Sequence, residues 1–80
     1  MDVKKFLLEF FSRRVPKEKI DPEADIFENG YIDSLGVFEL ITSLEKEFGV
    51  TFTEEDFQDR RFKTISGIVQ MVKEKSKVDP

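Results

Sequence analysis

The chain has 80 residues, and its formal net charge of −4 conceals an acidic middle: residues 21–59 carry twelve acidic side chains and a single basic one, Lys46. This middle argues against a nucleic-acid partner. The absence of Cys and His excludes disulfides, thiolate or imidazole metal sites and the usual general base. No apolar run approaches the roughly 20 residues of a membrane span, and the N-terminus lacks a signal-peptide core. We therefore expect one cytoplasmic domain over residues 1–80, without membrane insertion.

The first expected element is a helix over residues 2–14. Its apolar residues repeat at helical spacing, namely Val3, Phe6, Leu7, Phe10 and Phe11. Asp2 is the expected N-cap, and Arg13 and Arg14 are placed in the last turn, where cations are favoured. Pro16 is expected to end the helix near Arg14 or Val15.

The segment 15–33 is expected to be mostly loop, because proline, asparagine and glycine interrupt it. Asn29-Gly30 predicts a tight turn, and a short turn is also compatible with residues 23–25. So long a loop needs apolar anchors, for which the candidates are Ile20, Ile26, Phe27 and Ile32.

A second helix is predicted over residues 34–48, with Asp33 as its N-cap and Gly49 just beyond its end. Its apolar stripe contains Val37, Ile41, Leu44 and Phe48, and is widened by Phe38 and Leu40. Glu39, Glu45 and Glu47 are assigned to the exposed side. Ser34 stands at the junction of loop and helix, where a solvent-exposed hydroxyl lies near unpaired N–H groups that favour an anion.

Residues 50–52 are too short for a strand and are expected to form an extended connector. Thr53 then predicts the N-cap of a short acidic helix that reaches about Asp59. Thr64 predicts the N-cap of a last helix, whose apolar stripe contains Ile65, Ile68, Val69 and Val72. Residues 76–80 are expected to fray. The predicted fold is all-α, a small four-helix bundle of three longer helices and one short one with a long first loop.

The sequence does not support a calcium-binding loop, a catalytic serine or a phosphate-binding loop. An EF-hand loop starting at Asp25 has Gly36 where a bidentate glutamate is needed. Ser34 has no histidine and no flanking lysine to activate it as a nucleophile. The sequence contains no glycine-rich phosphate loop. We therefore expect no catalytic residue, no metal and no enzymatic activity.

A longer pattern is more specific than the tripeptide at Ser34. It runs Phe27-x-x-Gly30-x-x-Asp33-Ser34-Leu35, then Glu39-Leu40, Leu44-Glu45, Phe48-Gly49-Val50 and, after a short acidic helix, Phe62-Lys63-Thr64-Ile65. In order, spacing and length the chain resembles the acyl carrier protein and peptidyl carrier protein family. The form Gly-x-x-Asp-Ser-Leu-Gly is more similar to D-alanyl and specialised stand-alone carriers than to the carriers of fatty acid synthesis.

The resemblance implies that Ser34 receives 4′-phosphopantetheine from coenzyme A, and that the terminal thiol of the group carries cargo as a thioester. The implied partners are a phosphopantetheinyl transferase, an acyl- or aminoacyl-loading ligase and downstream acyl-processing enzymes. The chain itself is expected to be a monomer. The cargo is expected to be an acyl group of fatty acid, polyketide or related biosynthesis, or, as the alternative, D-alanine or another amino acid. A helical interaction module without the prosthetic group is the alternative of another class.

The resemblance also implies partner-recognition residues: Asp33, Leu35, Glu39, Glu45, Glu47 and Asp56. Leu35 is expected to face solvent, with burial in the core as the alternative. The acidic middle suits a basic partner surface, or it is a solvated face that aids solubility. Three residues depart from the fatty-acid type: Gly36 replaces an acid, Thr42 replaces a common methionine, and Lys46 interrupts the acidic face. The many phenylalanines are expected to fill the interior, which disfavours storage of a long acyl chain there.

Overall fold

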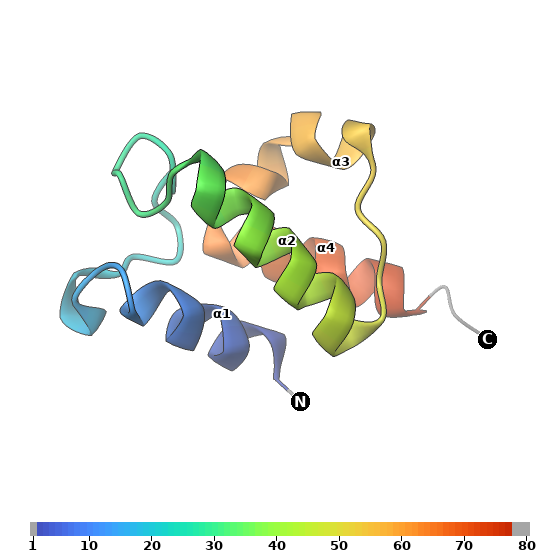
Figure 1. Ribbon diagram of the computed structural model, residues 1–80, viewed down its shortest axis with the longest axis horizontal. Coiled ribbons are helices and arrows are strands. Elements are labelled where there is room, and N and C mark those ends of the chain that lie inside the picture. Colours follow the sequence, from blue (N-terminus) through green and yellow to red (C-terminus); the bar gives the residue numbers. More distant parts are fainter. Residues whose placement is uncertain (1, 78–80) are drawn as a thin grey trace.

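The computed structural model describes residues 2–77. It contains the helices α1 (Val3–Ser12), α2 (Ser34–Phe48), α3 (Glu54–Gln58) and α4 (Ile65–Lys77), with two short 3₁₀-helices, η1 (Lys17–Lys19) and η2 (Arg60–Lys63). In Figure 1, α2 crosses the middle of the view between α1 and α3, and α4 lies behind it. The described residues contain no strand, and the fold is the predicted bundle of three longer helices and one short one.

Helix α1 is shorter than the 2–14 expected from the sequence. Asp2 is its N-cap, as predicted, and accepts hydrogen bonds from the amides of Lys4 and Lys5. At the other end, the amides of Arg14 and Val15 both donate to the carbonyl of Phe11, so the chain turns away after Ser12. The placement of Arg13 and Arg14 in the last turn was therefore wrong, because Pro16 restricts the residue before it and the helix ends earlier.

Ile26 and Ile32 anchor the loop after α1 by their burial, and Ile20 packs against the core from a half-buried position. Phe27 is 42% exposed but packs its ring against Phe62. The predicted turn is present, with Gly30 at φ 67°. The sequence did not indicate η1 or the burial of Tyr31.

Helix α2 begins and ends where the sequence predicted. The Asp33 carboxylate accepts the Gly36 amide, and Gly49 closes the helix at φ 66° while its N–H donates to the carbonyl of Glu45. Leu40 and Leu44 are fully buried. Phe38, however, is 75% exposed, so its assignment to the apolar stripe was wrong. It follows Val37 directly, and successive side chains on a helix diverge by roughly 100°.

The C-terminal half follows its predicted caps. Thr53 and Asp56 form a reciprocal capping box at α3, which ends one residue before Asp59, and the Gly67 amide donates to the Thr64 hydroxyl at 2.9 Å. Gly67 is required where α4 meets η2, because a Cβ there would overlap the carbonyl of Arg61. Residues 76 and 77, expected to fray, belong to α4, and the rest of that expectation lies outside the described residues.

The core joins side chains from all the long helices and from the loops between them. The largest fully buried side chains are Phe11, Leu7, Ile26, Leu40, Leu44, Ile65, Ile68, Met71 and Val72. Val50 and Phe52 bury the connector between α2 and α3 against this core. Among residues 2–77, no helix is both long enough and apolar enough to span a membrane.

Candidate functional site

Ser34 is the first residue of α2, and it is exposed. The preceding Asp33 caps the helix, because its Oδ1 accepts the Gly36 amide at 2.8 Å and its carbonyl accepts the Val37 amide at 3.0 Å. Within the described part of the chain, the amides of Ser34 and Leu35 have no acceptor. The hydroxyl therefore stands beside unpaired donors at the positive end of a 15-residue helix.

The loop that delivers Ser34 is tied to the C-terminal half of the chain. The Ile26 amide donates to the carbonyl of Lys63 at 2.8 Å, and the Ser66 amide donates to the carbonyl of Pro22 at 3.0 Å. The buried Tyr31 hydroxyl accepts the Asp21 amide at 3.1 Å and donates to the carbonyl of Lys19 at 3.0 Å. These bonds fix the entrance to α2 relative to α4.

The first turn of α2 is closely packed on the side that faces α1. A Cβ at Gly36 would lie 2.6 Å from Cγ1 of Ile32, 3.2 Å from Oδ1 of Asp33 and 3.3 Å from Nε of Arg14. A side chain at position 36 would therefore require Ile32 to move, so glycine suits this turn.

The solvent-facing side of the same turn is apolar. Leu35 is 76% exposed, as expected for a residue that faces solvent, and Phe38 is 75% exposed one turn further on. A shallow hollow of about 320 Å³ continues along this surface, lined by Phe38, Glu39, Thr42 and Ser43. The surface next to Ser34 is thus formed by two large apolar side chains.

The three glutamates expected on the exposed side of α2 differ in how far they are engaged within the fold. Glu39 forms an ion pair with Arg14 at 2.9 Å, although its side chain stays 66% exposed. Glu45, assigned to the exposed side, is half-buried, and its Oε2 accepts the Phe52 amide at 2.9 Å. Glu47 is exposed and has no ion-pair partner among residues 2–77.

Asp56 is also engaged within the fold. Its carboxylate accepts the Thr53 amide at 2.7 Å and pairs with the ammonium of Lys75 at 2.6 Å. Burial disfavours the charged carboxylate, but the hydrogen bonds from Lys75 and Thr53 outweigh it and lower the pKa of Asp56 below its ordinary 3.8. Asp56 therefore holds α3 on α4 before any partner is considered.

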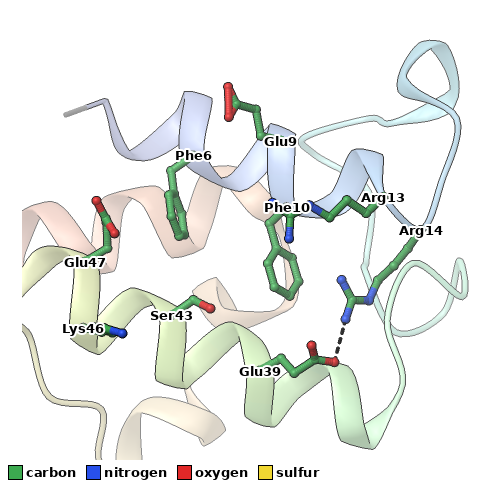
Figure 2. A pocket seen from close by; sticks show the side chains of 9 residues that line it. All are labelled: Phe6, Glu9, Phe10, Arg13, Arg14, Glu39, Ser43, Lys46 and Glu47. Atoms are coloured by element: carbon green, nitrogen blue, oxygen red, sulfur yellow. Dashed lines mark hydrogen bonds and ion pairs between the residues drawn. The ribbon is translucent and has the colours of Figure 1, made fainter.

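A groove of about 650 Å³ runs between α1 and α2 (Figure 2). Phe6 and Phe10 point from α1 toward α2, where Ser43 lies opposite them. Charged side chains line its rim, namely Glu9, Arg13, Arg14, Glu39, Lys46 and Glu47. The Arg14 guanidinium covers the ring of Phe10 at 4.4 Å and reaches Glu39, which closes one end of the groove.

Sequence reasoning did not assign Phe38, Arg14 or Tyr31 to the site. The sequence alone left the side of Phe38 undecided, because it lies roughly 100° from Val37 around the helix, at the edge of the apolar stripe. No sequence signal marked Arg14 or Tyr31, whose partners lie 25 and 10–12 residues away.

Comparison with known proteins places this geometry in context. A family model described as "Phosphopantetheine attachment site" matches residues 6–72, which include Ser34 and all of α2. A D-alanyl carrier protein of Bacillus velezensis (strain DSM 23117 / BGSC 10A6 / LMG 26770 / FZB42) is 36% identical over 56 residues, which cover 70% of this chain and 72% of the relative. A D-alanyl carrier protein of Streptococcus pyogenes serotype M5 (strain Manfredo) is 32% identical over 75 residues, covering 92% and 95%.

Proposed function

The chain belongs to the phosphopantetheine-attachment family of carrier proteins, and from this premise we propose that Ser34 is the residue that bears the group. Carriers of this family are not enzymes, and within the family this chain is closer to the D-alanyl type. The family implies covalently attached 4′-phosphopantetheine, whose terminal thiol carries cargo as a thioester. The observation that carries the proposal is the exposed hydroxyl of Ser34 at the start of α2, inside the matched region.

The residues around Ser34 fit a phosphodiester. The free amides of Ser34 and Leu35 and the positive end of α2 favour its negative charge. Asp33 is the nearest negative charge in sequence and would repel the phosphodiester, but its Oδ1 accepts the Gly36 amide. The exposed hydroxyl leaves space for the group outside the bundle.

The sequence places no histidine or lysine beside Ser34, so we assign the proton acceptor of the attachment step to the transferase. In the proposed step the Ser34 hydroxyl loses its proton to a base of the transferase, and its Oγ forms a bond to the pantetheine-side phosphorus of coenzyme A. The phosphoanhydride bond breaks, and 3′,5′-ADP leaves. The chain contributes a well-placed nucleophile, since the Asp33 cap and the tied loop hold the backbone that carries the Ser34 hydroxyl.

We propose D-alanine as the cargo, in preference to the fatty or polyketide acyl groups first expected. The support is that the relatives matched over most of the chain are named D-alanyl carrier proteins, and that the Asp33-Ser34-Leu35-Gly36 form of the motif agrees. A ligase that activates D-alanine with ATP is then the loading enzyme. We place the loading and delivery of D-alanine in the cytoplasm, where coenzyme A and ATP are available.

For partner recognition we retain Asp33, Leu35, Glu39 and Glu47, which are exposed. Glu45 and Asp56 are retained only in a supporting role, because their carboxylates already bind Phe52 and Lys75. Exposed ion pairs with a partner would contribute about 0–1 kcal/mol each, so the acidic residues act chiefly on the rate of encounter.

The first test is intact mass after incubation with coenzyme A and a broad-specificity phosphopantetheinyl transferase. We expect a gain of one phosphopantetheine unit in the wild type and none in Ser34→Ala. The product is then given D-alanine, L-alanine or octanoate with matching ligases and ATP, and we expect loading with D-alanine to be the most efficient. No gain under conditions that modify a control carrier would favour an interaction module without the group, and preferential loading of octanoate would contradict the cargo.

A further inference from the structure

The Arg14 side chain lies between the end of α1 and the first turn of α2. Its guanidinium covers the ring of Phe10 at 4.4 Å, and its Nη2 donates to Oε1 of Glu39 at 2.9 Å. Its Nε is 3.3 Å from the place that a Cβ at Gly36 would take. These contacts leave the side chain only 26% exposed. Arg14 is therefore a positive charge with a defined position beside the start of α2.

Glu39, the partner of Arg14, is the first carboxylate within α2. It follows Ser34 by five residues, which is about 7.5 Å along the helix axis. Figure 2 shows its side chain turned toward Arg14, although 66% of that side chain stays exposed. A protein interface of ordinary size covers about 800 Å² of each partner. An enzyme that acts on the Ser34 hydroxyl therefore comes close to both charges of this pair.

The surroundings of the pair are acidic. Residues 21–59 carry twelve acidic side chains against the single basic Lys46, so the field of this segment favours a partner surface rich in arginine and lysine. Arg14 lies outside this segment in sequence, and the fold brings it against α2. Its neighbour Arg13 is exposed and has no ion-pair partner among residues 2–77. Arg14, not Arg13, thus neutralises a carboxylate of α2.

We infer that Arg14 is a specificity-determining residue of this carrier. Because it neutralises Glu39 and places a positive charge beside the helix of Ser34, it slows the approach of enzymes that bind through arginine and lysine. The contact with Phe10 holds the guanidinium in place, so the positive charge remains when a cationic partner arrives. Enzymes whose contact surface is not basic are unaffected. The inference rests on the proposed function of Ser34.

The test is the transfer of phosphopantetheine from coenzyme A by a transferase selected for an arginine- and lysine-rich carrier-binding surface. At about 50 mM salt we expect Arg14→Gln to raise kcat/KM about three- to fivefold, since Glu39 is then free to attract this enzyme. The gain should disappear at about 500 mM salt, because salt screens exposed charges. Arg14→Lys keeps the positive charge and should stay within about twofold of the wild type. If Arg14 only supported the fold, its loss would lower kcat/KM instead.

Arg13→Gln is the matched control, because it removes the same charge from the adjacent position without freeing a carboxylate among the described residues. Its effect on kcat/KM should be less than half that of Arg14→Gln. The double variant Arg14→Gln/Glu39→Gln lacks both charges of the pair and should return to within about twofold of the wild type.

Equal gains in Arg13→Gln and Arg14→Gln would show that only net charge matters, and would overturn the inference. A kcat/KM that does not rise in Arg14→Gln, or a gain that persists at high salt, would overturn it as well. The proposed function is tested separately, since failure of the broad-specificity transferase to modify the wild type would contradict the role of Ser34 itself. Melting temperatures verify that all variants are folded.

Discussion

At the scale of single residues, Tyr31 decides how the loop delivers Ser34. Its ring is buried and tilted against Phe11, and its hydroxyl serves as acceptor for the Asp21 amide and donor to the Lys19 carbonyl. One side chain thereby satisfies two backbone groups of a loop that has little regular structure. Buried backbone groups without partners are costly, so this hydroxyl substitutes for secondary structure.

We predict that Tyr31→Phe lowers the free energy of unfolding by about 1–2 kcal/mol, because it leaves both backbone groups without their partner while keeping the ring. Urea denaturation of the wild type and the variant measures the difference. Ser43→Ala is a suitable control, since its hydroxyl has no hydrogen bond among the described residues. Equal stabilities of Tyr31→Phe and wild type would show that water replaces the hydroxyl at no cost.

At the scale of elements, α3 depends on contacts beyond its own sequence. Five residues are too few for a helix to persist alone. The capping box of Thr53 and Asp56 starts it, the Asp56–Lys75 ion pair ties it to α4, and Lys75 also lies 5.1 Å from the ring centroid of Phe52. The side chains of Lys75 and Asp56 are only 23% and 19% exposed, so solvent weakens this pair less than a fully exposed one.

We predict that Asp56→Asn, which keeps a capping oxygen but removes the charge, costs about 1 kcal/mol of unfolding free energy at pH 7. The pKa of Asp56 in the folded state lies below its ordinary 3.8. The charge of Asp56 therefore contributes its full stabilisation above about pH 3.8, and this stabilisation is lost as the pH falls through the lowered pKa. Unfolding at pH 7 and at pH 3 should therefore show the difference between wild type and variant shrinking in acid. A difference independent of pH would mean that the ion pair does not stabilise the fold.

At the scale of the whole molecule, the interior is filled by large side chains. Fully buried Phe11, Leu44, Ile68 and Met71 occupy the space between the helices, and the wide groove beside α1 is open to solvent with a charged rim. A bundle packed in this way has little room for a long acyl chain without displacing core residues. A small aminoacyl cargo makes no such demand.

We predict that an octanoyl chain loaded on Ser34 stays outside the bundle. Chemical-shift changes on loading should then be confined to Ser34 and its neighbours, while the core methyl groups of Leu7, Leu44 and Ile68 keep their shifts. Comparison with the unloaded phosphopantetheine form is the control. Changes throughout the core would show that the helices separate to admit the chain.

The sequence alone determined most of the elements of this protein and the candidate attachment residue. Apolar periodicity located the long helices, and Asp2, Asp33, Thr53 and Thr64 marked their beginnings, because a cap and its helix are adjacent in the chain. Ser34 was identifiable for the same reason, since its position depends on the local junction of loop and helix.

Only the tertiary structure decided which side chains remain available to a partner. Glu39 pairs with Arg14 across 25 residues and Asp56 with Lys75 across 19, so their charges are engaged by groups that no local pattern connects to them. Phe38 is apolar and at first sight belongs to the stripe, yet the packing of α2 on α1 and α4 leaves it outside. Periodicity reports the spacing within one helix, whereas exposure depends on where the other helices lie.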